Sequence, residues 1–128
     1  MGEIIIIEDD ELLRQMLVRW LGANGYPVRE AGNGHEGLRL MRERPATLVI
    51  TDLVMPDMEG IETIRHLRRG YPQTKIVAIS GGGVGDANGY LKIASELGAH
   101  RTFAKPFFPG ELLCAVQELL QPRQSAPT

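Results

Sequence analysis

Residues 48–62 read LVITDLVMPDMEGIE, and this stretch decides how the rest of the chain is interpreted. Apolar and β-branched residues lead directly into Asp52. A short loop follows, and then Ile61, Ile64 and Leu67 recur at helical spacing. A buried strand that ends in an acid and continues into an amphipathic helix is one βα unit of a parallel sheet.

The same unit recurs along the whole chain, as five apolar segments that alternate with five helical patterns. The predicted strands are residues 3–7, 26–31, 47–51, 75–80 and 101–104. The predicted helices end at glycine and proline punctuation, namely Gly22 with Gly25, Arg44-Pro45, Gly70-Tyr71-Pro72 and Gly98. The alternation implies a flavodoxin-like (βα)5 three-layer sandwich, with a five-stranded parallel sheet of order 2-1-3-4-5.

Composition is that of one ordinary globular domain. The chain has 128 residues, 43% hydrophobic content and a net charge of −2, so we expect a domain over residues 1–121 and a flexible tail over 122–128. The charge balance argues against a nucleic-acid surface, and no apolar run is long enough to cross a membrane. The single Cys114 lies in an apolar helical pattern and is expected in the core, which fits a cytoplasmic protein.

Polar residues gather where the predicted strands end. The acids Glu8 and Asp9 follow strand 1, and Asp52, Ser80 and Lys105-Pro106 end strands 3, 4 and 5. In the predicted strand order these side chains converge on one edge of the sheet, where α/β proteins bind ligands. Crowded carboxylates need a cation, and an all-oxygen site open to water suits Mg²⁺ (or Mn²⁺). With Lys105 beside it, such a site can stabilise a phosphoryl group on a carboxylate.

Each of these residues also has an ordinary structural explanation. Acids after a strand cap the next helix, and Asp10 is the expected cap. A single Asp or Ser at a strand end forms turns, and a single Lys is usually solvated. The conjunction of five such residues at one edge favours a functional site.

The chain resembles the receiver domain of two-component response regulators over nearly all of residues 3–121. The resemblance is carried by IIIIEDDELLRQML, LVITDLVMPDMEGIE, IVAIS and LGAHRTFAKPF, in this order and spacing. It implies that Asp52 accepts the phosphoryl group, that Asp9 binds Mg²⁺ directly and that Glu8 acts through water. It further implies roles for the Val54 carbonyl in the metal site, for Ser80 and Lys105 at the phosphoryl group, and for a cis peptide bond between Lys105 and Pro106.

The resemblance also implies the partners. The phosphoryl donor would be a phosphohistidine on a sensor histidine kinase or a histidine phosphotransfer protein. The chain would catalyse only its own phosphorylation and dephosphorylation, so it is not expected to be an enzyme. It would signal to a downstream protein, through the face of the fourth helix, fifth strand and fifth helix, or pass its phosphoryl group on. His35, His66 and His100 are expected outside the pocket.

Two features depart from the family pattern. Thr102 stands three residues before Lys105, where the family usually has an aromatic switch residue, and Phe103 should face the other side of the sheet. The loop SGGGVGDANGY, residues 80–90, holds five glycines but matches neither a P-loop nor a dinucleotide motif. We therefore hypothesise that residues 81–89 carry the conformational switch.

Three alternatives compete with a phosphorylated receiver. A degenerate receiver would serve as a docking module without phosphorylation, although it should have lost the acid pair, Asp52 or Lys105. A phosphatase with an aspartyl nucleophile would want a second Asp at position 54, where Val54 stands. An FMN-binding protein is compatible with the fold alone, and fold does not imply function.

Overall fold

Five parallel strands and five helices alternate along the chain in the computed structural model, which describes residues 2–53, 60–81 and 87–121 (87–91 by backbone alone). The strands are β1 (Ile4–Ile7), β2 (Val28–Ala31), β3 (Leu48–Asp52), β4 (Lys75–Ser80) and β5 (Arg101–Ala104). The helices are α1 (Glu11–Ala23), α2 (Gly34–Glu43), α3 (Gly60–Gly70), α4 (Ala87–Leu97) and α5 (Pro109–Leu120). The sheet has the order β2-β1-β3-β4-β5, as predicted.

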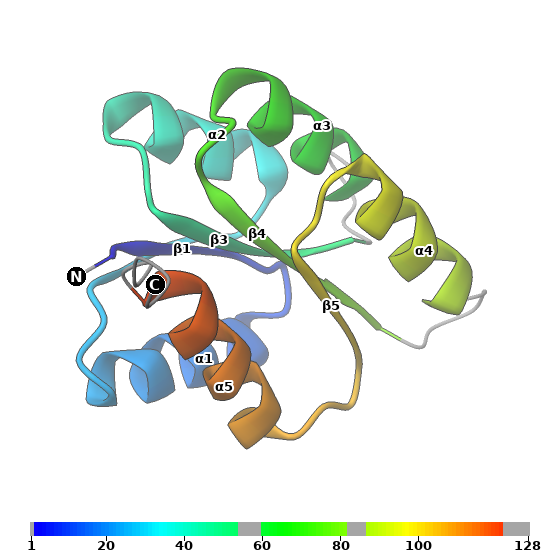
Figure 1. Ribbon diagram of the computed structural model, residues 1–128. Coiled ribbons are helices and arrows are strands. Elements are labelled where there is room, and N and C mark those ends of the chain that lie inside the picture. Colours follow the sequence, from blue (N-terminus) through cyan, green and yellow to red (C-terminus); the bar gives the residue numbers. More distant parts are fainter. Residues whose placement is uncertain (1, 54–59, 82–86, 122–128) are drawn as a thin grey trace, which may run out of the picture.

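Helices cover both faces of the sheet, so the fold has three layers (Figure 1). Strand residues alternate between the two faces. Ile5, Val49 and Ile76 face α2, α3 and α4, whereas Ile6 and Ile50 face α1 and α5. All five side chains are buried, which explains why the central strands are nearly continuous runs of Ile, Val and Leu.

Local signals set the helix boundaries. Asp10 caps α1, because its side chain accepts hydrogen bonds from the backbone N–H groups of Leu12 and Leu13. After α4 the chain turns at Gly98, whose φ of +116° favours glycine. The predicted cap and this predicted stop are both confirmed.

The strands agree with their predicted positions to within two residues. β2 begins at Val28 rather than residue 26, because the N–H of Tyr26 still bonds the carbonyl of Leu21 and closes α1. β3 runs one residue further than predicted and includes Asp52. This extension places Asp52 on the rigid sheet rather than in the loop that follows.

One prediction about the core is wrong. Cys114 is exposed, because the buried side of α5 is made by Leu112, Ala115 and Val116. Position 114 lies two residues after Leu112, about 200° around the helix, and so faces solvent. On α1, Met16 is 56% exposed, although Leu17 beside it is buried.

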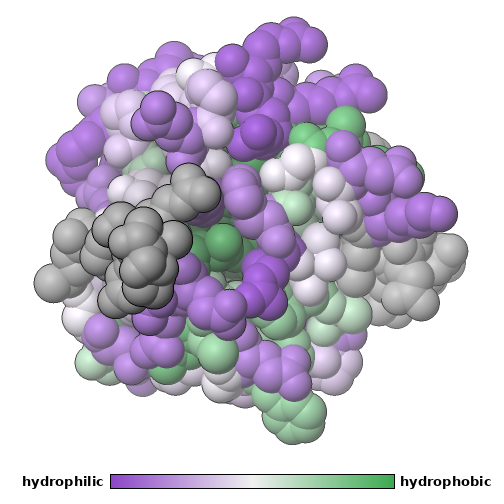
Figure 2. All heavy atoms as spheres, viewed as in Figure 1, coloured by the Kyte–Doolittle hydropathy of each residue, from purple (hydrophilic) through white to green (hydrophobic). Residues whose placement is uncertain are grey.

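Hydrophilic and apolar residues are unevenly spread over the face seen in Figure 2. Figure 2 shows hydrophilic residues over α2 and α3, and apolar residues reaching the surface around α5. Among the described residues, no helix is long and apolar enough to span a membrane.

Candidate functional site

The candidate site lies at the edge where the strands end, on the turn between β1 and α1. The backbone N–H of Glu8 makes the last ladder bond to β2, to the carbonyl of Ala31 at 3.0 Å. The chain then turns through Asp9 and Asp10 into α1. The Glu8 carboxylate accepts a hydrogen bond from the N–H of Asp10 at 3.1 Å, which fixes the turn.

Three carboxylates meet at this turn, as predicted from the strand order. Glu8, Asp9 and Asp52 each place one oxygen within 4.8 Å of the others. Glu8 and Asp52 are buried, with 1% and 4% of their surface exposed, whereas Asp9 is exposed. The site is therefore closed on the side of the sheet and open on the side of Asp9.

Lys105 supplies the positive charge. Its Nζ donates to Oδ2 of Asp52 at 2.9 Å and lies 3.0 Å from Oε1 of Glu8. One ammonium group thus bridges the two buried carboxylates. Because both acids are desolvated, removing Lys105 should destabilise the protein more than removing one partner of an exposed ion pair would.

The electrostatics follow from this arrangement. The pKa of Glu8 is raised to about 7, first by burial and second by the charge of Asp52, and this is the net result after the Asp10 N–H and Lys105 have opposed both effects. Burial works to lower the pKa of Lys105, but the hydrogen bond to Asp52 and the ion pair with Glu8 outweigh it, so this pKa is raised. Near neutral pH the pocket therefore holds a charged lysine and a Glu8 close to its titration point.

The donor set fits a small hard cation. Every side-chain ligand offered by Glu8, Asp9 and Asp52 is a carboxylate oxygen, the ligand type that Mg²⁺ and Mn²⁺ prefer. Glu8 Oε1 is buried and has no hydrogen-bond partner among the described residues, although the Lys105 charge lies near it. A buried oxygen in this state can accept from a metal-bound water. Val54, whose carbonyl was predicted to join the site, lies outside the described residues.

β4 and β5 bring Ser80 and Lys105 to the same edge. The N–H of Lys105 bonds the carbonyl of Ser80 at 2.8 Å, which extends the strand pairing by one step. Ser80 is fully buried, and its hydroxyl contacts the Gly81 carbonyl at 3.5 Å, where a hydrogen bond is weak. The peptide bond between Lys105 and Pro106 is cis.

Gly60, the first residue of α3, packs against the end of β3. A Cβ at this position would lie 2.1 Å from the carbonyl oxygen of Asp52 and 2.3 Å from the Cα of Leu53. Only glycine allows this approach, because real Cβ atoms do not come within 3.0 Å of backbone. The start of α3 is thereby held directly against the strand end that carries Asp52.

The aromatic on β5 faces away from the side of Thr102. Thr102 pairs with Ala78 and shares its face, toward α3 and α4. Phe103 packs with the α1–α5 side of the core and lies 6.1 Å from the Phe107 ring. The prediction that Phe103 points to the opposite face is confirmed. Most of the loop over 81–89, the predicted switch, lies outside the described residues.

The three histidines also lie where they were predicted, away from the carboxylates. His35 is exposed on α2, and His66 is exposed on α3. His100 precedes β5 at the opposite end of the strand from Lys105, and its Nδ1 accepts from the N–H of Ile76 at 3.1 Å.

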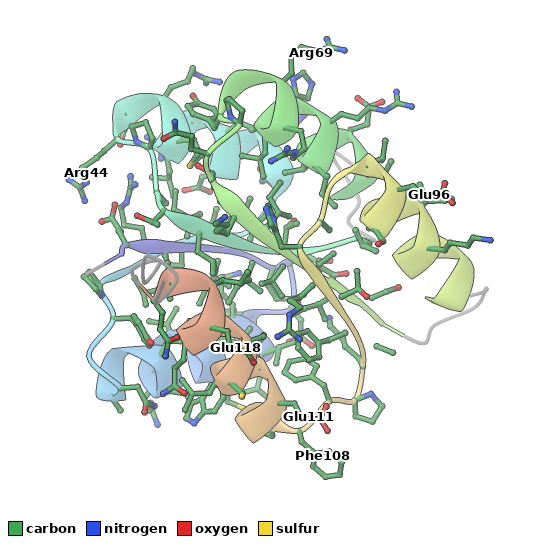
Figure 3. The ribbon with its side chains drawn as sticks, viewed as in Figure 1. Arg44, Arg69, Glu96, Phe108, Glu111 and Glu118 are labelled. Carbon is green, nitrogen blue, oxygen red and sulfur yellow. The ribbon has the colours of Figure 1, made fainter. Side chains whose placement is uncertain are left out.

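An apolar groove begins at the pocket and follows α1. It has a volume of about 1040 Å³, and it runs from Lys105 and Gly81 past Met16 and Trp20. Leu12, on its wall, is 72% exposed. Figure 3 shows Phe108, 75% exposed, pointing away from the protein at the lower end of α5. The sequence does not reveal this groove, because the groove depends on where the segment from Lys105 to Pro109 lies against α1.

A family model described as the response regulator receiver domain matches residues 4–117. The chain belongs to this family. Receiver domains are signalling domains of two-component systems rather than enzymes in the ordinary sense, and the family binds Mg²⁺ at the acidic pocket. The fold and the position of the acidic cluster in this receiver domain agree with that assignment.

Individual relatives give the same result. The receiver domain is 32% identical over 126 residues to the transcriptional regulatory protein SrrA of Staphylococcus aureus. The match covers 97% of this chain and 50% of SrrA. It thus spans about half the length of the curated relatives it matches. A receiver domain protein from Clostridium thermocellum has a TM-score of 0.85 at 26% identity, covering 93% of this chain and 94% of that one.

The chemotaxis protein CheY4 of Vibrio cholerae is also similar in structure. It has a TM-score of 0.82 at 28% identity, and the match covers 94% of this chain and 99% of that one.

One polar contact at the site could not be predicted from the sequence. Arg14, on α1, donates from Nη1 to the backbone carbonyl of Glu8 at 2.9 Å. Its position six residues after Glu8, in the second turn of the helix, is the signal that was available. A cation at that spacing is also a common helix-surface residue, so the pattern alone does not reveal the contact.

Proposed function

We propose that this receiver domain accepts a phosphoryl group on Asp52 in the presence of Mg²⁺, from a phosphohistidine on a sensor histidine kinase or a histidine phosphotransfer protein. The observation that carries the proposal is the buried Asp52 carboxylate between two further acids and Lys105. A degenerate docking module would have no use for this arrangement. The complete set of acids and lysine is the reason to prefer phosphorylation.

Each residue has a defined task in this reaction. An oxygen of Asp52 attacks phosphorus as the P–N bond of the donor breaks, and the bonding electrons leave with the imidazole nitrogen. Lys105, now paired with Asp52 and Glu8, can move its ammonium group onto a phosphoryl oxygen. The Ser80 hydroxyl, at the end of the adjacent strand, can donate to another.

Glu8 and Asp9, with the Val54 carbonyl expected from the family, would hold the metal ion. Bound Mg²⁺ would supply positive charge that offsets the charge of the transferring phosphoryl group. Glu8 would act through a metal-bound water, because its buried Oε1 makes an ion pair with Lys105 but no hydrogen bond within the described residues. Asp9, exposed at the mouth of the pocket, would bind the ion directly.

The donor has to reach Asp52 from the open edge of the sheet. The apolar groove along α1 begins at that edge, and Leu12 and Met16 are exposed on it. We include in the proposal that the donor protein lays an apolar surface in this groove while its phosphohistidine faces Asp52. Small phosphodonors would not use the groove, and this difference makes the docking testable.

The output is proposed to leave by the face of α4, β5 and α5, through altered binding of a protein or onward phosphotransfer. Ile93 is 46% exposed on α4, and Arg101 and Glu118 form an ion pair at 2.8 Å between β5 and α5. Thr102, in place of an aromatic, favours a switch through the loop over residues 81–89. The protein is proposed to act in the cytoplasm, with residues 1–121 as the signalling domain.

The experiment is incubation with acetyl phosphate, with and without Mg²⁺, followed by intact mass measurement. The wild type should gain the mass of one phosphoryl group only with Mg²⁺, and Asp52→Asn should gain none. Equal adducts on both proteins would refute the proposal. A partner that binds both proteins equally after this treatment would instead support the docking-module alternative.

A further inference from the structure

The β1–α1 turn is held by more than its own backbone. In a parallel sheet the N–H and C=O of one residue face the same neighbouring strand. The N–H of Glu8 bonds Ala31 of β2, so its carbonyl should accept next from the N–H of residue 33. At that point the chain has left β2, because Asn33 is the N-cap of α2. The guanidinium of Arg14 donates to the Glu8 carbonyl instead, at 2.9 Å.

Arg14 is itself fixed from two sides. Its Nε donates to Oε1 of Glu30 on β2 at 2.9 Å, and its backbone N–H bonds the carbonyl of Asp10 at 2.9 Å. The Arg14 side chain is 18% exposed, so the contact is largely shielded from water. The guanidinium therefore ties the end of β1, the first turns of α1 and the end of β2 together.

The Glu8 carbonyl belongs to the peptide group that joins Glu8 to Asp9. Rotation of this group would move the Asp9 carboxylate relative to Glu8 and Asp52, whose oxygens now lie within 4.8 Å of one another. Hydrogen bonds to ligand residues set ligand orientation, and losing one commonly lowers metal affinity tenfold or more. The contact with Arg14 is such a hydrogen bond, made through the backbone.

We propose that Arg14 is a positioning residue of the metal site: held by Glu30, its guanidinium fixes the Glu8–Asp9 peptide group so that both acids face Asp52. The proposal rests on the proposed function, because it assumes that these acids bind the metal. Arg14 contacts neither the metal nor the phosphoryl group in this account.

The test measures Mn²⁺ binding by electron paramagnetic resonance, well below the melting temperature of every variant. Arg14→Met should raise the dissociation constant on the order of tenfold. Arg14→Lys should recover part of the lost affinity, because an ammonium group can donate to the Glu8 carbonyl or to Glu30 but cannot bridge both as a guanidinium does. Arg39→Met is the matched control, since Arg39 forms exposed ion pairs on α2 and should bind Mn²⁺ like the wild type.

Hydrogen exchange in the metal-free protein gives a second readout. Arg14→Met should speed exchange at the amides of Asp9 and Asp10, and Arg39→Met should not. If Arg14→Met does not fold, Glu30→Gln serves in its place, with a smaller rise in the dissociation constant and the same change in exchange.

The outcomes separate the two proposals. A wild type that binds no Mn²⁺ overturns the metal site and, with it, the role of Arg14. A wild type that binds Mn²⁺, with Arg14→Met and Glu30→Gln binding equally well, overturns the role of Arg14 alone. A loss of thermal stability without any change in Mn²⁺ affinity would show that the contact is only structural.

Discussion

Replacing Glu8 by Gln should stabilise the metal-free protein above neutral pH, although the change removes an ion pair. Glu8 is 1% exposed and lies beside Asp52, and burial first and the charge of Asp52 second raise its pKa from 4.5 to about 7. The folded protein thus holds this proton more tightly than the unfolded chain does. The contribution of Glu8 to folding stability must therefore fall as pH rises from 4.5 to about 7 and stay level above that range.

The size of the effect follows from the same values. At about 1.4 kcal/mol per pH unit, the interval from 4.5 to about 7 corresponds to roughly 3 kcal/mol. Glutamine has the shape of the protonated acid and cannot ionise. Glu8→Gln should therefore match the wild type below pH 4.5 and exceed its free energy of unfolding by roughly 3 kcal/mol at pH 8.

Urea unfolding followed by Trp20 fluorescence, in buffers with a chelator, measures this difference. Glu36→Gln is the control, because Glu36 is an exposed acid on α2 and its removal should change stability by less than about 0.5 kcal/mol. Added Mg²⁺ should stabilise the wild type and leave Glu8→Gln nearly unchanged. The reasoning is refuted if the Glu8→Gln difference is the same at pH 5 and pH 8, or if the variant is the less stable protein at pH 8.

Three further changes probe other parts of the structure. Burial and the nearby charges of Lys75 and Arg68 lower the pKa of His100, whose neutral ring accepts a hydrogen bond from a backbone N–H. The stability that His100 contributes is therefore present above pH 6.5 and should be lost as pH falls below that value. His100→Gln should lack this decline in urea titrations. Gly60→Ala should lower the free energy of unfolding by about 1–3 kcal/mol and slow phosphorylation, because the new Cβ would meet the backbone at the end of β3. Gly70→Ala is the control: a Cβ there would have nothing within 4 Å, so this variant should be neutral in thermal melts. Leu12→Glu, on the groove along α1, should slow transfer from a phosphohistidine protein at least tenfold and leave acetyl phosphate kinetics unchanged; equal slowing of both reactions would argue against docking there.

The fold could be predicted because its information is local. Runs of Ile and Val buried on both faces identify strands, and glycine or proline marks each helix end. The position of Asp52 beside Glu8 and Asp9 then follows from the strand order. Lys105 was placed at this edge in the same way, from a strand of four residues.

Other features depend on geometry that spacing does not carry. The exposure of Cys114 depends on the phase of α5, which a run of apolar residues at neighbouring positions leaves open. Arg14 can contact the Glu8 carbonyl because β2 ends at Ala31, before the chain could supply an N–H to that carbonyl. The groove depends on how the segment after Lys105 lies against α1. Each of these three features is determined by the tertiary structure and not by residue spacing.

The measurement that tests the central claim most directly is to locate the phosphoryl group. After treatment with acetyl phosphate and Mg²⁺, borohydride reduces an aspartyl phosphate to homoserine, and peptide mass spectrometry identifies the converted residue. We predict homoserine at Asp52 alone, and none without Mg²⁺. Two results would contradict the account. One is reduction at another acid, seen as homoserine at Asp9 or as the corresponding alcohol at Glu8, and the other is an unmodified Asp52 after treatment.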